Sequence, residues 1–120
     1  MVSFYETYTR CRPHILAAIE LNHGTYNEED ILRGLLTGEF VLWPGANSAV
    51  VTEISEQPRM KVLSMFICGG ELEELIEMEK DLETYARLKG CKMMRGEGRP
   101  GWGRAMPGYE PGGTAYKVLS

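Results

Sequence analysis

The feature that most constrains the fold is the order of three segments between residues 60 and 95. An apolar strand is followed by a long amphipathic helix and then by a short strand. MKVLSMFIC at 60–68 is almost uniformly apolar, which is typical of a central strand buried on both faces. ELEELIEMEKDLETYARLKG then predicts a helix that ends at Gly90. CKMMR at 91–95 predicts a strand parallel to 60–68, because such crossovers place two parallel strands side by side.

Upstream, two helices and two further strands are expected. RPHILAAIELN at 12–22 predicts a short helix with Pro13 in its first turn. Asn27 is a good N-cap for a second helix that Gly38 ends. EFVLW and SAVVTEI at 48–54 are strand-like and precede the strand at 60–68, with turn residues between them, so the three indicate an antiparallel meander.

Downstream, the glycine-rich stretch 96–113 has room for one short helical turn at 102–106, before TAYKVL forms a last strand. With 120 residues and 43% hydrophobic content, we expect a single domain over 1–120. Its fold class is α+β, with a mixed, mostly antiparallel sheet, two N-terminal helices, one long helix and one short helix.

Composition limits the location and the chemistry. No apolar run approaches the roughly 20 residues that cross a bilayer, and the first ten residues lack a signal-peptide pattern, so we expect no membrane partner. Cys11, Cys68 and Cys91 indicate free thiols in a reducing compartment. His14 and His23 have no metal-ligand spacing, so no metal site is predicted.

Charge is divided along the chain. Residues 71–83 carry seven acids against Lys80, whereas residues 85–104 carry six basic residues against Glu97. The basic stretch could meet phosphate or an acidic partner, but solvated charges with some intramolecular pairing are favoured. Because the net charge is -4 and no recognition motif is present, nucleic acid is not expected as a partner.

The order of elements resembles the GNAT acetyltransferase fold over roughly residues 11–119. The local pattern is ARLKGC, then KMMRGEGR, then GWGRAMPGY, which is similar to that superfamily's helix, strand, short helix and closing Gly-aromatic pair, here Gly108 and Tyr109. More narrowly, VLSMFICGG together with GRPGWGR and the later GY resembles small GNAT-like proteins of tailed bacteriophages. The resemblance implies a location in the virion or the host cytoplasm.

The resemblance also implies where acetyl-CoA would bind. The superfamily holds the pyrophosphate on backbone amides of a glycine-containing loop before a helix, a position that Cys68, Gly69 and Gly70 occupy here. No basic residue precedes this helix, and Glu71, Glu73 and Glu74 crowd its start. Carboxylates there favour the helix dipole and repel phosphate, so we expect a capped helix start and no cofactor, with acetyl-CoA as the alternative.

The residues for catalysis are incomplete, so no catalytic residue is predicted. The superfamily's general-acid tyrosine falls on Arg104, and its frequent asparagine falls near Glu97. Glu53 or Glu97 could act as a general base only if burial raised its pKa, and a solvated carboxylate is favoured for each. Cys68 could be a nucleophile, but a small core residue is favoured.

Four residues are candidates for contact with another protein: Trp43, Arg99, Trp102 and Arg104. Trp102 could instead be a core residue, and Trp43 could simply cover the sheet edge. Three hypotheses remain: a non-catalytic contact module, for which the phage resemblance implies a place in the virion; an active N-acetyltransferase on a small amine or protein; and a regulatory or host-interaction protein. The oligomeric state is left open.

Overall fold

The computed structural model describes residues 3–21, 25–96 and 115–119. These residues form an α+β fold with three helices and a five-stranded mixed sheet. In chain order the elements are α1 (Phe4–Leu21), α2 (Glu28–Thr37), β1 (Phe40–Pro44), β2 (Ser48–Glu56), β3 (Lys61–Gly70), α3 (Leu72–Leu88), β4 (Cys91–Gly96) and β5 (Ala115–Val118). The short helical turn expected at 102–106 lies outside the described residues.

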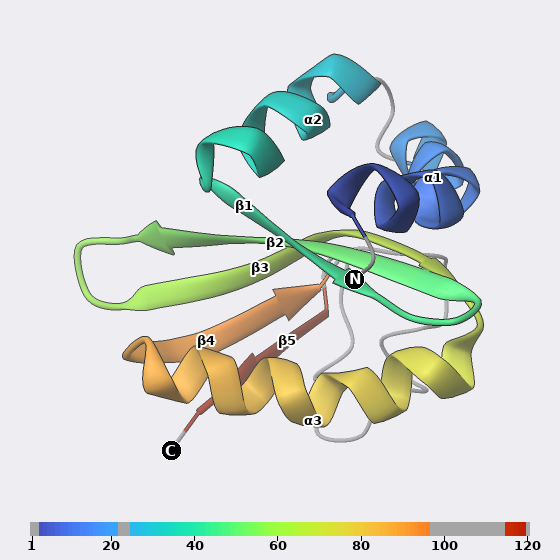
Figure 1. Ribbon diagram of the computed structural model, residues 1–120. Coiled ribbons are helices and arrows are strands. Elements are labelled where there is room, and N and C mark those ends of the chain that lie inside the picture. The colour runs from blue at the N-terminus through green and yellow to red at the C-terminus, as the bar shows by residue number, and fades with distance from the viewer. Residues whose placement is uncertain (1–2, 22–24, 97–114, 120) are drawn as a thin grey trace.

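The sheet lies between two layers of helices. Its strand order is β1-β2-β3-β4-β5, and α1 and α2 cover one face while α3 covers the other (Figure 1). Neighbouring strands are antiparallel except β3 and β4, which are parallel and joined by α3. The predicted meander, the central position of the third strand and the crossover are therefore confirmed.

A separate hydrophobic core fills each side of the sheet. The core under α1 and α2 contains Tyr8, Cys11, Ile15, Ala18, Ile31, Phe40, Ala49, Val51, Phe66 and Ile67. The core under α3 contains Val50, Leu63, Met65, Leu75, Leu82, Ala86, Cys91, Met94 and Leu119. Because β2 and β3 supply residues to both cores, these two strands hold the layers together.

Helix α1 is longer than expected, which corrects the predicted start. It begins at Phe4, so Pro13 lies inside the helix and not in its first turn. The hydroxyl of Ser3 accepts a hydrogen bond from the backbone N–H of Glu6 at 3.1 Å, which caps the earlier start. Tyr8 and Cys11 continue the buried stripe of Ile15, so burial of this face offsets the backbone hydrogen bond that Pro13 cannot donate.

Strand β3 contains an irregularity and extends further than predicted. Ile67 pairs with Val51 but Met65 pairs with Thr52, so Phe66 is an extra residue on β3. Phe66 and Ile67 therefore both face the core under α1 and α2, as expected at a β-bulge. The strand continues to Gly70, and helix α3 follows after a single residue.

Candidate functional site

The predicted pyrophosphate position lies where β3 meets α3, but its glycines are strand residues. Cys68, Gly69 and Gly70 pair with Val50, Ala49 and Ser48 of β2, so they do not form the loop that the sequence suggested. This register places the end of β3 beside the β1–β2 turn. The start of α3 therefore faces another part of the same chain.

Both glycines allow close approach of backbone atoms from elsewhere in the chain. A Cβ atom on Gly69 would collide with the carbonyl group of His14 in α1. Gly70 has a φ of 109°, and a Cβ atom there would collide with the carbonyl oxygen of Asn47 and with Ser48. Glycine is therefore required at these positions for packing of α1 and the β1–β2 turn.

Glu74 connects the first turn of α3 to the β1–β2 turn. Its carboxylate accepts hydrogen bonds from the backbone N–H of Asn47 at 2.9 Å and from the hydroxyl of Ser48 at 2.6 Å. The hydrogen bond from Ser48, and then that from the Asn47 backbone, lower the pKa of Glu74. A negative charge thus stands at this helix start, held by the protein's own donors.

The cap of α3 differs in form from the one expected. Glu71 is the N-cap residue, but its side chain makes no capping hydrogen bond. Its backbone N–H donates instead to the carbonyl oxygen of Asn47 at 3.0 Å. The helix start is therefore fixed by the β1–β2 turn, through Glu71 and Glu74, and not by a carboxylate bonded to its own first turn.

The two other described candidates for chemistry, Cys68 and Glu53, differ in their surroundings. The thiol of Cys68 donates to the carbonyl oxygen of Met65 at 3.5 Å, and its side chain packs against the core under α3, which agrees with a core role. Burial, and then the nearby carboxylate of Glu39, raise the pKa of Glu53, which is the direction that a general base would need.

Trp43 makes its contacts within the molecule. Its indole N–H donates to the hydroxyl of Thr52 at 3.0 Å, and its ring meets Tyr85 of α3 edge-on, with centroids 5.2 Å apart. These contacts agree with the alternative in which Trp43 covers the sheet edge. The other predicted contact residues, Arg99, Trp102 and Arg104, lie outside the described residues, as does Glu97.

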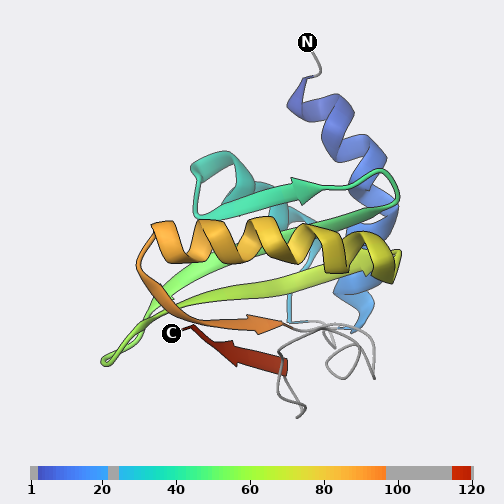
Figure 2. The same ribbon diagram turned by 90° about the horizontal axis from the view of Figure 1, so that it is seen from below.

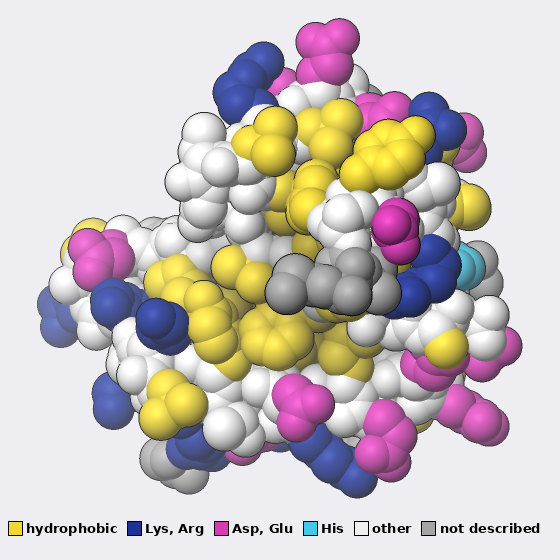
Figure 3. All heavy atoms as spheres, viewed as in Figure 1, with side chains coloured by type: hydrophobic (Ala, Val, Ile, Leu, Met, Phe, Trp, Pro, Cys, Tyr) yellow, Lys and Arg dark blue, Asp and Glu magenta, His cyan; other side chains and the backbone are white. Residues whose placement is uncertain are grey.

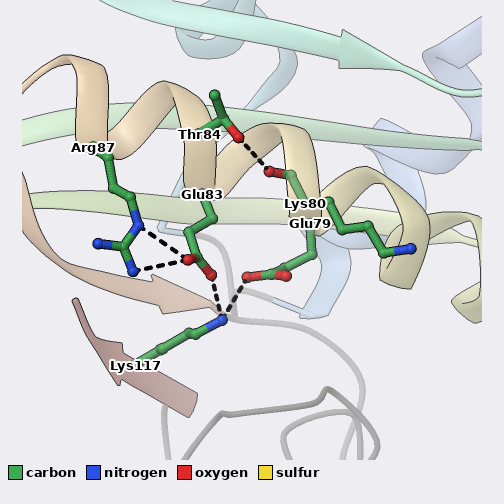
Figure 4. Close-up of polar contacts among 6 residues, drawn as sticks. All are labelled: Glu79, Lys80, Glu83, Thr84, Arg87 and Lys117. Atoms are coloured by element: carbon green, nitrogen blue, oxygen red, sulfur yellow. Dashed lines mark hydrogen bonds and ion pairs between the residues drawn. The ribbon is translucent and has the colours of Figure 1, made fainter. Parts of the chain in front are cut away.

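A charged cluster between α3 and β5 did not follow from the sequence. Lys117 of β5 reaches toward α3, where its Nζ bonds to Glu79 at 3.2 Å and also to Glu83 (Figure 4). Arg87 bonds to Glu83 at 2.9 Å. Burial lowers the pKa of Lys117, but hydrogen bonds to Glu83 and Glu79 outweigh it and raise the pKa. The acidic face of α3 is thus partly paired within the molecule, as was favoured from the sequence.

A pocket of about 310 Å³ lies on the α3 side of the sheet, at the β1 edge. Its lining consists of Gly38, Glu39, Val41, Thr52, Ile54 and Tyr85. Figure 3 shows hydrophobic side chains gathered on this face between α2 and α3. The lining offers apolar contacts and one carboxylate, a combination that suits binding more than bond-making chemistry.

Within residues 3–21, 25–96 and 115–119, no group of three His, Cys, Asp or Glu residues could hold a metal ion. No helix in this part of the chain is long and apolar enough to cross a membrane. A comparison of the chain with protein-family models, with curated proteins and with solved structures found no match.

Proposed function

We propose that this chain is a non-catalytic GNAT-like domain that serves as a protein-contact module. One observation carries the proposal: the start of α3, where the superfamily seats pyrophosphate, is occupied by the chain's own β1–β2 turn. The N–H of Glu71 and the carboxylate of Glu74 are both bonded to this turn. A phosphate would have to displace these contacts and approach a carboxylate at close range.

Titration with acetyl-CoA tests this proposal. At millimolar ligand we expect no change in melting temperature and no heat of binding by calorimetry. If the coenzyme bound at one hundred times its dissociation constant, it would stabilise the fold by about 2.7 kcal/mol and raise the melting temperature by several degrees. Stabilisation of that size would contradict a non-catalytic role.

A variant makes the titration more specific. Glu74→Gln removes the charge but keeps a side chain that can still accept a hydrogen bond from Ser48. If charge alone excluded the coenzyme, this variant would bind acetyl-CoA while the natural protein would not. If the packed turn excludes it as well, neither protein binds, and this is the outcome that we expect.

The resemblance to small phage proteins extends the proposal to a component of a virion. Mass spectrometry of purified particles from a phage that encodes the chain should detect it at a stable copy number. Absence from the particles would leave a contact role inside the host cell and would exclude the virion component.

The acetyltransferase alternative is favoured by one described feature, the raised pKa of Glu53. In that alternative Glu53 accepts a proton from the attacking amine. Glu53→Gln would then abolish transfer of the acetyl group to an amine, whereas a contact module shows no such activity before or after the substitution.

A further inference from the structure

Strand β1 is an open edge of the sheet among the described residues. It stands first in the strand order, and among the described strands it pairs with β2 alone. Four of its five residues, FVLW, are apolar, and the strand ends at Pro44, a residue that protects such edges. An edge of this kind can accept another strand through its backbone.

The register shows which backbone groups face outward. The N–H of Gly45 donates to the carbonyl oxygen of Ser48 at 2.9 Å, so this pair is hydrogen-bonded within the hairpin. Hydrogen-bonded pairs alternate along an antiparallel ladder, so Val41 is bonded to Thr52 in the same way. The backbone N–H and C=O groups of Phe40 and Leu42 consequently point away from β2, toward the open edge.

Apolar contacts for an added strand lie beside this edge. A residue placed opposite Val41 would face the α3 side of the sheet, next to the pocket that Val41, Ile54 and Tyr85 line. On the other side, the N-terminal end of α1 projects past the β1 edge (Figure 2). Tyr5 in this projecting end is 76% exposed.

The negative charge beside the β1 edge indicates which side chains an added strand needs in order to bind there. Glu39 directly precedes Phe40, and Phe40 pairs with Glu53 of β2, so the register brings the two carboxylates to the same end of the β1 edge. Burial, and then the charge of Glu39, raise the pKa of Glu53, which agrees with this placement. Neither carboxylate has a lysine or arginine within salt-bridge distance in the part of the chain that is described. Two adjacent carboxylates at an open strand are complementary to a lysine or arginine.

We propose that β1 is the docking edge for an extended segment of a partner protein, in which an apolar residue enters the pocket beside Val41 and a basic residue meets Glu39 and Glu53. This inference rests on the proposed function and names the partner's chemistry. The segment adds a sixth strand next to β1 through the backbone groups of Phe40 and Leu42.

A fluorescently labelled heptapeptide of alternating lysine and valine is the probe. We expect it to bind the full chain, as measured by anisotropy, and to shift the amide resonances of Phe40 and Leu42 more than others in ¹H–¹⁵N spectra. A peptide with glutamate in place of lysine, and one methylated on its alternate backbone nitrogens, should each bind at least about tenfold more weakly.

Two matched protein variants distinguish a charge effect at the β1 edge from an effect of the protein's net charge. Glu39→Lys should weaken binding by about tenfold, because it puts a like charge beside the docked lysine. Glu73→Lys makes the same change of net charge on the exposed first turn of α3 and should leave binding within about twofold, since Glu73 lies twelve positions before Tyr85, the α3 residue that lines the pocket. Melting temperatures of both variants check that each is folded.

The docking edge would be overturned if the peptide did not bind at about 1 mM, or if Glu39→Lys and Glu73→Lys weakened its binding equally. It would also be overturned if the methylated peptide bound as well as the unmethylated one, or if the protein formed a dimer that already covers β1. These outcomes can be told apart from a failure of the proposed function, because that function is tested by acetyl-CoA and not by the peptide. If acetyl-CoA leaves the melting temperature unchanged while the peptide does not bind, only the docking edge is wrong. If acetyl-CoA stabilises the protein, the contact module is wrong whatever the peptide does.

Discussion

At the scale of single residues, two glycines that both have a positive φ angle have different surroundings. Gly38, at the end of α2, and Gly70, at the end of β3, have φ values of 86° and 109°. A Cβ atom on Gly38 would meet nothing within 4 Å, whereas one on Gly70 would collide with the main chain of Asn47. The pair therefore separates the cost of placing a side chain at a positive φ from the cost of a steric collision.

We predict that Gly38→Ala lowers the free energy of unfolding by about 1 kcal/mol, the cost of a left-handed alanine. Gly70→Ala should cost about 2 to 4 kcal/mol, because the collision adds an overpacking term. Urea unfolding followed by circular dichroism measures both values. Equal losses would mean that the β1–β2 turn can move away from β3, and the packed junction at α3 would then be an open one.

Two lysines test how much burial strengthens an ion pair. Lys117 bonds to Glu79 at 3.2 Å, and Lys80 bonds to Glu77 at the same distance. Glu79 is only 7% exposed, whereas the second pair lies on the surface. We predict that Lys117→Met costs about 2 kcal/mol, less than a fully buried pair because Lys117 is partly solvated, and that Lys80→Met costs under about 0.5 kcal/mol. Urea unfolding of the two variants gives the comparison.

At the scale of elements, α2 packs on β1 through a glycine within the helix. A Cβ atom on Gly34 would collide with the ring of Phe40, which is itself packed against Phe66 with centroids 4.7 Å apart. Alanine is favoured over glycine in a helix by about 1 kcal/mol. The ring contact and the helix preference therefore act in opposite directions at this position.

We predict that Gly34→Ala destabilises the protein by about 1 to 2 kcal/mol, because overpacking exceeds the gain in helix preference. In a Phe40→Leu background the smaller side chain leaves room, and the same substitution should become neutral or stabilising. A double-mutant cycle in urea measures this reversal. An unchanged cost in both backgrounds would show that Phe40 does not set the distance between α2 and the sheet.

The elements themselves were largely predictable because their signals are local. Apolar periodicity and turn residues gave the meander, α3 and the parallel crossover. The start of α1 was missed, although Tyr8 and Cys11 continue the spacing of Ile15 and Ser3 precedes Glu6 by three residues. The extra residue at Phe66 leaves no mark in the sequence, because a bulge is fixed by pairing with β2.

At the scale of the whole molecule, the candidate site depends on contacts between distant segments. Carboxylates at the start of α3 were expected to favour the helix dipole and to repel phosphate. Glu74 also bonds to Asn47 and Ser48, 27 and 26 positions earlier in the chain. Spacing along the chain cannot show such a contact, since it arises only when β2 and β3 align in register. For the same reason the pairing of Lys117 with α3 could not be predicted.

The response of the fold to acid follows from carboxylates that join separate elements. Arg12 and Tyr8 of α1 donate hydrogen bonds to Glu28 of α2 and so join the two helices. These hydrogen bonds, that from Arg12 first, lower the pKa of Glu28. A hydrogen bond from Lys117 chiefly lowers the pKa of Glu83, which joins α3 to β5. Burial instead raises the pKa of Glu53. The ordinary value for all three is 4.5.

The direction of each effect is set by which state binds more protons. Near pH 4.5 the unfolded chain holds more protons than the folded chain at Glu28 and Glu83, so their stabilisation is full above that pH and is lost as the pH falls. At Glu53 the folded chain holds more protons, so its carboxylate destabilises the fold at neutral pH and does so less as the pH falls.

We predict that Glu83→Gln is less stable than the natural protein near pH 7 and that this difference shrinks as the pH falls below 4.5. Glu53→Gln should be more stable near pH 7, and its advantage should also shrink as the pH falls. Urea unfolding at a series of pH values provides the two curves. If Glu53→Gln follows the same course as Glu83→Gln, then the Glu53 carboxylate has a favourable partner in the folded protein, and the docking edge does not offer it as an unpaired charge to a basic residue.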